Sequence, residues 1–305
     1  MAKATSKKGN TPAKKELINP TSYAFLKTYI NNASPVGFET SGQKLWLDYI
    51  KKYVDTTFTD AYGTAVGVIN PDAPFKVVIE AHADEISWFV NYINDQGLIH
   101  LKRNGGVDHQ IAPSMRVWIH GKKGPVKAVF GWPAIHTRLS NPEQKEPQPK
   151  VDNLTLDCGA RSKKEVEALG IHIGSVVTYE EGFDELANNF IIGRAFDNRV
   201  GGFMIAEVAR ILKENKKKLP FGLYIVNAVQ EEIGLRGAEM IARRIKPNIA
   251  IITDVTHDTH TPMISKAIEG DIQCGKGPSL AYAPAIHTKL LAIVEATANA
   301  KKIPV

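Results

Sequence analysis

The spacing of apolar residues and glycines changes twice along the chain, and this change constrains the fold more than any single motif. From 20 to 85, segments with helically spaced apolar residues alternate with short β-branched runs. From 86 to 182, short segments of alternating apolar and polar residues are separated by glycines. From 183 to 305 the pattern of residues 20–85 returns. Such glycine-punctuated strands are typical of a small barrel or sandwich, whereas alternating helices and strands form layered α/β structures. The sequence therefore predicts one α/β domain in two sequence pieces, interrupted by an all-β insertion.

The individual elements are predicted from the spacing of apolar residues and from turn residues. Helices are expected at 22–30, 41–54, 163–169, 201–213, 237–244 and 286–300. Strands are expected in a hairpin over 56–69 and at 76–81, 115–120, 126–130, 152–157, 221–229 and 248–253. The polar segment 137–150 contains three prolines and is expected to be an exposed loop.

Charge and composition argue against several other classes of protein. The net charge of +6 falls to about +1 without the five lysines of residues 1–15, so the basic character belongs to a disordered tail over 1–19 rather than to a nucleic-acid surface. No apolar run reaches the length of a membrane span, and the amino terminus lacks the apolar region of a secretory signal. Cys158 and Cys274 are too far apart for a metal knuckle. We therefore predict a cytoplasmic protein without nucleic-acid or membrane partners.

Acidic and imidazole side chains follow three of the predicted strands, at the point where each strand ends. They are His82 and Asp84 after 76–81, Glu231 and Glu232 after 221–229, and Asp254 after 248–253. Ligand sites in open α/β sheets gather at the carboxyl ends of strands. A fourth segment, 193–199, leads into a predicted helix and would bring Asp197 to the same rim. Each cluster alone also fits a polar loop or a solvated face, but their joint position favours one site.

Imidazole and carboxylate ligands without thiols suit Zn²⁺, Mn²⁺ or Co²⁺. The spacing of His82 and Asp84 would let the aspartate orient the imidazole from behind. On an extended backbone Glu231 and Glu232 would point to opposite sides, so that one binds metal while the other accepts a proton from a water. A glycoside hydrolase with two catalytic carboxyl groups is an alternative, but clustering with a histidine favours a metal site.

Several segments resemble the signature segments of the M42 metallopeptidases, the TET-type glutamyl and leucyl aminopeptidases once sometimes labelled endoglucanases. The similar segments are 82–86, 193–199, 229–238 and 252–256, together with 34–39 and 275–278, in the family's order. The resemblance runs from about residue 20 to the end. It implies a central mixed sheet flanked by helices, built from 20–85 and 183–305, with the barrel of 86–182 serving dimerisation.

The resemblance also implies an activity and a role for each site residue. It implies a metallo-aminopeptidase that hydrolyses N-terminal residues from peptides by means of a water activated by two divalent metals, Zn²⁺ or Co²⁺ before Mn²⁺. His82 and Asp254 would bind the first metal, Asp197 would bridge, and Glu232 would bind the second. Glu231 would be the general base and Asp84 would orient His82. The implied partners are peptides with a free N-terminus and further copies of the chain, from a dimer to a dodecamer.

The sequence departs from the family pattern at its end. Family members continue into a late segment that carries the remaining histidine ligand of the second metal, and this sequence resembles a version without that segment. The second metal position therefore has only Asp197 and Glu232, which leaves a catalytically impaired or structural family member as an alternative. None of the other histidines is expected to be a ligand. His257 and His260 are expected in a polar loop and His287 at the start of the last predicted helix. The structural or surface histidines of the insertion are His100, His109, His120, His136 and His172.

Overall fold

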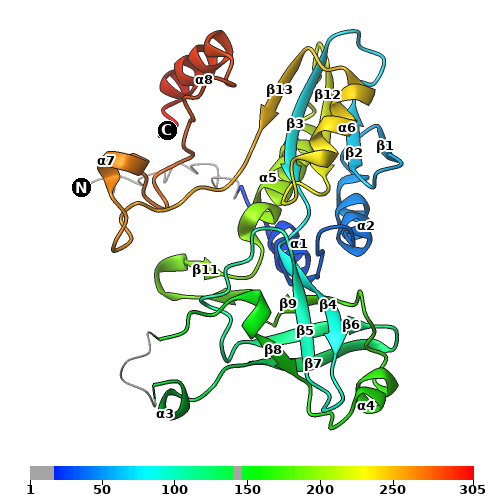
Figure 1. The fold of residues 1–305 in the computed structure, drawn as a ribbon. Coiled ribbons are helices and arrows are strands. Elements are labelled where there is room, and N and C mark those ends of the chain that lie inside the picture. Colours follow the sequence, from blue (N-terminus) through cyan, green and yellow to red (C-terminus); the bar gives the residue numbers. More distant parts are fainter. Residues whose placement is uncertain (1–16, 140–145, 181) are drawn as a thin grey trace, which may run out of the picture. The chain divides into compact units, whose positions relative to one another are not determined.

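The computed structural model describes residues 17–139, 146–180 and 182–305 (Figure 1). Most of the predicted basic tail and the middle of the predicted polar loop thus lie outside the described residues. The described chain divides into two compact units, the first ending at Thr253 and the second running from Asp254 to Val305. We describe each unit by itself.

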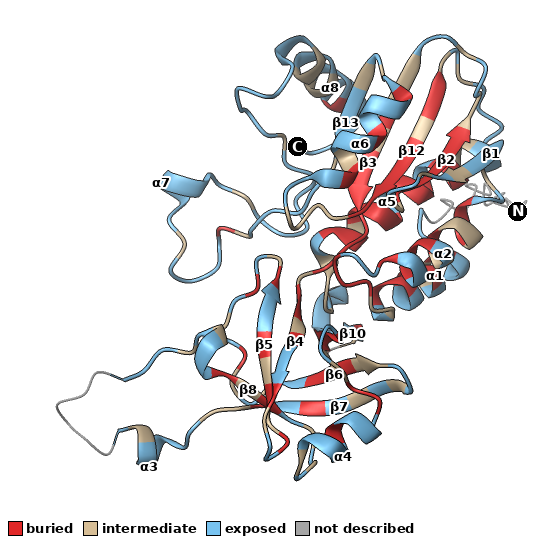
Figure 2. Ribbon diagram, turned by 45° about the vertical axis from the view of Figure 1, so that its right-hand side comes forward, coloured by how far each residue is buried: buried red, intermediate tan, exposed pale blue. Residues whose placement is uncertain are grey.

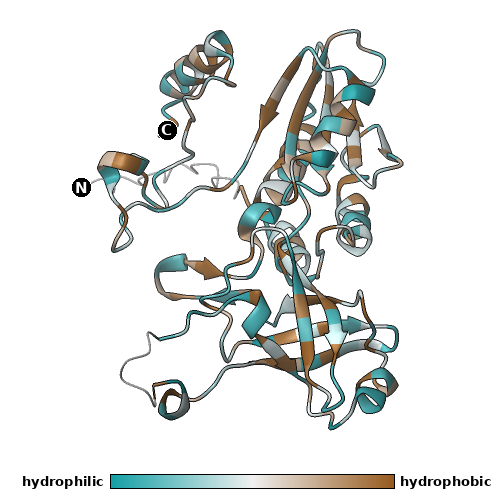
Figure 3. Cartoon of the chain, in the orientation of Figure 1, coloured by the Kyte–Doolittle hydropathy of each residue, from teal (hydrophilic) through white to brown (hydrophobic). Residues whose placement is uncertain are grey.

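A five-stranded mixed sheet lies at the centre of the first unit, in the order β1-β2-β12-β3-β13. The strands span Thr56–Thr59 (β1), Ala65–Ile69 (β2), Lys76–His82 (β3), Gly222–Ala228 (β12) and Ile249–Ile252 (β13). β3 runs parallel to both β12 and β13, whereas β2 is antiparallel to β1 and β12. The parallel strands β3 and β12 are largely buried, as their nearly continuous apolar runs predict (Figures 2 and 3). The carboxyl ends of β3, β12 and β13 therefore meet at one edge of the sheet.

Helices cover both faces of this sheet. They span Pro20–Asn31 (α1), Thr40–Ile50 (α2), Phe196–Glu214 (α5) and Arg236–Ile245 (α6). Because side chains alternate along a strand, Leu223 and Ile225 of β12 pack with α1, α2 and α5, whereas Val226 packs with α6 on the other face. α1 begins where Asn19 accepts a hydrogen bond from the Ser22 amide at 2.9 Å, with a proline in the first turn.

A closed six-stranded barrel follows β3, in the order β4-β5-β8-β7-β6-β9. Its strands span Ser87–Ile93 (β4), Ile99–Asn104 (β5), Arg116–Gly121 (β6), Gly124–Gly131 (β7), Thr155–Asp157 (β8) and Val176–Tyr179 (β9). The interior is filled by apolar side chains such as Trp88, Phe130 and Leu156, and the helix α4 (Lys163–Ala168) adds Val166. A short helix, α3 (Ile135–Arg138), and the 3₁₀ turn η1 (Val151–Asn153) flank the segment between β7 and β8.

A short hairpin leads from the barrel back to the sheet. It consists of β10 (Asp184–Glu185) and β11 (Ile191–Ile192), joined through the 3₁₀ turn η2 (Ala187–Asn189). The carboxy-terminal unit contains the helices α7 (Lys266–Glu269) and α8 (Thr288–Lys301). Among the helices of the described residues, none is both long and apolar enough to cross a membrane.

The predicted fold class is confirmed, because a central mixed sheet with helices on both faces carries a closed all-β barrel. The largest differences from the predicted helix boundaries are two. The helix predicted over 41–54 ends at Ile50, since residues 51–53 form a turn that returns the chain to β1. The helix predicted over 201–213 begins earlier, at Phe196, although Asp197 and Asn198 in its first turn have non-helical backbone angles.

Candidate metal centre

His82 is the last residue of β3 and the most enclosed member of the predicted group. Its side chain is 2% exposed. The Nδ1 atom lies 3.2 Å from the backbone oxygen of Asp84 and 3.5 Å from its carboxylate, while Nε2 lies 2.9 Å from Oδ1 of Asp197. The imidazole is thus held from behind by the Asp84 residue and presents its other nitrogen to Asp197, the arrangement expected of an oriented metal-ligating histidine.

Asp197 reaches His82 from the first turn of α5. Its side chain is 57% exposed, so the group is open on the Asp197 side and closed on the His82 side. The segment around Asp197 is fixed by its neighbour Asn198, whose side-chain amide donates to the Thr253 carbonyl at 2.6 Å. Asp197 therefore combines an accessible carboxylate with a backbone that is anchored beyond the end of β13.

Asp84 is fully buried and joins the first two predicted clusters. One of its carboxylate oxygens accepts the backbone N–H of Glu231 at 3.0 Å, and the other accepts that of Glu232 at 3.1 Å. Glu232 lies in a turn, so the two glutamates do not lie on the extended backbone that we predicted. The residues after the turn pack closely against the end of β12, because a side chain at Gly237 would clash with the carbonyl oxygen of Val229. Asp84 thus sets the positions of both glutamates through their amides.

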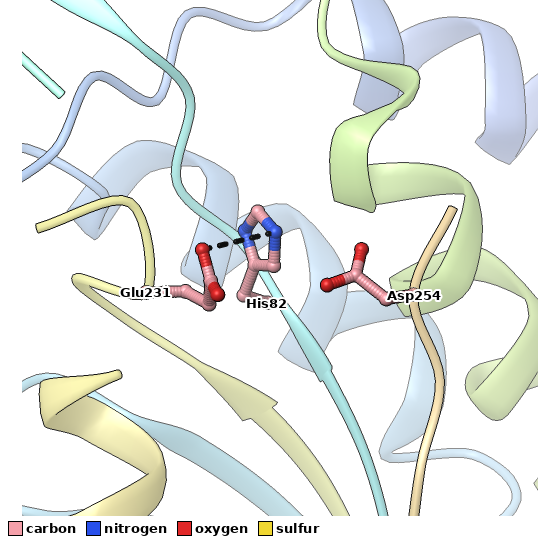
Figure 4. A group of neighbouring side chains, drawn as sticks. All are labelled: His82, Glu231 and Asp254. Carbon is pink, nitrogen blue, oxygen red and sulfur yellow. Dashed lines mark ion pairs between the residues drawn. The ribbon is translucent and has the colours of Figure 1, made fainter. Parts of the chain in front are cut away.

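Both glutamate side chains face His82. Oε2 of Glu231 lies 3.7 Å from Nε2 of His82 (Figure 4). The ligand atoms of His82, Asp197 and Glu232 all lie within 4.8 Å of one another. Ligands about 2.0–2.2 Å from a common metal would be separated by nearly this distance or less. These three side chains could therefore contribute ligands to a divalent-metal centre after only small adjustments, with Glu231 beside them.

The ionisation of this group reflects burial and crowded negative charge. Burial raises the pKa of Glu232 to about 7, and the Asp197 carboxylate adds to the effect. Burial alone would lower the pKa of His82, but hydrogen bonds to Asp197 and Asp84 outweigh it and raise the pKa to about 11. A glutamate whose pKa is raised, beside an imidazole that holds a proton and among further carboxylates, belongs to a donor set suited to a divalent cation.

Asp254, labelled in Figure 4, is the first residue of the carboxy-terminal unit. It follows Thr253 by one peptide bond, and the Thr253 amide donates to the Glu80 carbonyl of β3 at 2.9 Å. The chain therefore leaves the sheet beside the strand that carries His82. The role of Asp254 as a ligand stays a prediction.

Glu85 has a supporting part that the sequence reasoning did not assign. Its carboxylate is 2% exposed and lies 2.6 Å from Nε of Arg194 and 3.9 Å from Nη1 of Arg199. It also accepts the Ser34 amide at 2.7 Å. Because Arg194 and Arg199 flank Asp197 in sequence, Glu85 ties the Asp197 segment to the end of β3. The sequence shows Arg194 and Arg199 on either side of Asp197, but only the folded structure shows that Glu85 is their buried partner.

Comparisons with known proteins agree with this fold and group. The family model described as M42 glutamyl aminopeptidase matches residues 63–305. A lysyl aminopeptidase of Pyrococcus furiosus is 30% identical over 92% of this chain and 79% of its own length. The TET aminopeptidase of a marine-sediment Thaumarchaeota archaeon superposes with a TM-score of 0.88 at 26% identity, covering 93% of this chain and 79% of that one.

The TET1 peptidase of Pyrococcus horikoshii, whose structures form a tetrahedron or a large octahedral shell, has a TM-score of 0.77. At 23% identity, over 93% of this chain and 82% of that one, this likeness supports the fold alone. A mixed sheet with a barrel insertion and a histidine–carboxylate group at its rim places the protein among the metallo-aminopeptidases. Within that class, the chain belongs to the M42 glutamyl aminopeptidase family, as its signature segments predict.

Proposed function

We propose that the chain removes N-terminal residues from peptides with the aid of two divalent metals held at the rim of its sheet. The observation that carries the proposal is the convergence of His82, Asp197 and Glu232 within 4.8 Å, with Glu231 alongside. These residues come from the ends of two strands and from the start of α5. The fold, and not their closeness in sequence, therefore brings them together.

The metal positions are assigned to residues as follows. His82 and Asp254 would hold the first metal, Asp197 would be shared, and Glu232 would hold the second. Histidine nitrogen and carboxylate oxygen without thiolate favour Zn²⁺ or Co²⁺, and Mn²⁺ also accepts such ligands. Metals bound there supply Lewis-acid polarisation of the scissile carbonyl and lower the pKa of a water.

Glu231 acts as the general base in this proposal. Its side chain is 25% exposed, so it is held by the fold yet open to a water. Its backbone is fixed by the hydrogen bond to Asp84, which aims the carboxylate beside His82. Glu231 accepts a proton from the attacking water and afterwards donates it to the leaving amine. Asp84 positions this base and the His82 imidazole together.

Further copies of the chain are the proposed protein partners. By analogy with the tetrahedral or octahedral shell described for the Pyrococcus horikoshii peptidase, we expect a homo-oligomer, anywhere from a dimer to a dodecamer. The closed barrel is the candidate dimerisation element, because it forms its own apolar core and is not needed to complete the sheet. Sedimentation velocity of the chain and of a variant with charges on the outer barrel surface would test this assignment.

The test of the catalytic proposal is the substitution Glu231→Gln. It keeps the shape of the side chain but removes the base, so kcat should fall by about 10²–10⁴ while metal content stays unchanged. The matched control is Glu167→Gln on the exposed surface of α4, which should change neither. Full activity of Glu231→Gln would contradict the base assignment.

Metal analysis separates the active enzyme from an impaired or structural subunit. Two metals per chain with peptide turnover support the active form. One metal or none, with no turnover by the folded chain, supports the impaired form.

A further inference from the structure

A cavity of about 630 Å³ opens directly beside the candidate metal centre, within the first unit. Asp197 and Glu232 form part of its wall, so whatever binds in it lies next to two of the proposed ligands. The volume lies within the range of about 300–1,000 Å³ that is usual for small-molecule sites. A substrate residue attached to the scissile carbonyl could therefore place its side chain here.

The rest of the wall comes mainly from the barrel and the hairpin, and it is mostly apolar. Ile86, Met115 and Tyr179 are partly buried around the cavity. Ile111, which is 60% exposed, and Ile192, which is 46% exposed, lie on the same wall. Single exposed apolar residues need no explanation, but several that converge on one cavity beside a catalytic group define an apolar binding surface.

Apart from the candidate ligands Asp197 and Glu232, the charged residues on the wall are either paired with another charged side chain or exposed to water. Glu180 pairs with Arg116 at 3.1 Å and also with Lys127. Glu85 pairs with Arg194 at 2.6 Å. Asp184 lies on the exposed strand β10, where water screens its charge. The wall therefore offers a charged substrate side chain compensated or solvated partners rather than a dedicated counter-ion.

We propose that this cavity receives the side chain of the substrate's N-terminal residue and selects large apolar residues over acidic and basic ones. The inference rests on the proposed function, since it assumes that the adjoining group cleaves the peptide. A buried charge without a counter-ion carries a large desolvation cost, whereas an apolar side chain gains from leaving water. This chain would thus differ in preference from the relative named for lysine and from the glutamyl activity in the family's description.

The first experiment compares kcat/KM of the metal-loaded chain on aminoacyl-coumarin amides, in which only the first residue varies. We expect leucine, methionine and phenylalanine substrates to exceed glutamate and lysine substrates by about 10²-fold or more. Highest activity on glutamate or lysine would overturn the inference and leave the proposed function standing. Absence of turnover on every substrate would instead contradict the proposed function.

A second experiment places a charge in the cavity. Ile111→Lys should lower kcat/KM for the leucine substrate by about tenfold or more and raise the ratio of glutamate to leucine activity. The matched control is Ile173→Lys, because Ile173 is also an exposed barrel residue, at 62%, but does not line the cavity. Melting temperatures of both variants check folding. If Ile111→Lys unfolds, Ile192→Lys on the exposed hairpin tests the same wall.

Dipeptides that vary the second residue complete the test. If the apolar wall receives the N-terminal side chain, Ile111→Lys should alter selectivity at the first residue and leave selectivity at the second unchanged. A change confined to the second residue, or equal effects of Ile111→Lys and Ile173→Lys, would overturn the inference.

Discussion

Two clusters of charged side chains lie at the end of β3, and their buried negative charge is compensated in different ways. In the first, Glu85 is enclosed by Arg194 and Arg199 and accepts a backbone amide. In the second, the single imidazole of His82 faces the carboxylates of Asp84, Asp197 and Glu231. The clusters lie within a few residues of each other in sequence, yet only the first is balanced by permanent cations.

This difference separates a structural role from a catalytic one. Arginine stays charged at all relevant pH values and donates in a fixed fork, so the charge of Glu85 is balanced without any ligand. In the His82 cluster, by contrast, burial and then the Asp197 carboxylate raise the pKa of Glu232, and hydrogen bonds to Asp197 and Asp84 raise the pKa of His82, as expected where several carboxylates face a single imidazole. A divalent cation would supply the missing charge. Substitutions in each cluster test this difference.

The largest effect on stability is expected from Glu85→Ala. Removing the acid leaves two enclosed guanidinium groups with carbonyl acceptors but without the carboxylate that balances their charge, which costs about 3–5 kcal/mol of unfolding free energy. Chemical denaturation of the metal-free chain would measure the loss. Glu167→Ala, at an exposed position, should stay within about 0.5 kcal/mol of the parent. A loss at Glu85 no greater than at Glu167 would show that the arginines do not depend on this carboxylate.

Asp84→Asn tests the second cluster with a nearly isosteric change. The amide can present only one acceptor oxygen, so one of the Glu231 and Glu232 amides loses its partner and the support of His82 weakens. We expect metal affinity to fall by about 10–100-fold. Calorimetric titration of the folded variant with Zn²⁺ would measure the change. Unaltered affinity would reduce Asp84 to a packing role.

The same contrast explains what the sequence could reveal. The ends of β3, β12 and β13 were predictable, because hydrophobic spacing determines where strands stop and parallel strands end on one edge. The two hydrogen bonds from Asp84 to the glutamate amides were not, because they depend on a turn whose geometry is set by contact between elements distant in sequence. The cavity wall was also hidden, since Ile111 and Ile192 approach Glu232 only after the barrel closes.

The smallest effect concerns pH and the metal-free chain. Because the pKa of Glu232 is raised to about 7, its contribution to stability is fully present below about pH 4.5 and is lost as the pH rises through 7. The raised pKa of His82 acts in the same direction, above about pH 6.5. The melting temperature should therefore decline by a few degrees from pH 5 to 8. Glu232→Gln removes the titrating carboxylate and should flatten this decline, whereas the exposed Glu167→Gln should leave it unchanged. A melting temperature that rises from pH 5 to 8, or that declines equally steeply in Glu232→Gln, would contradict this prediction. The ionisation of Glu232 would then not destabilise the metal-free His82 cluster.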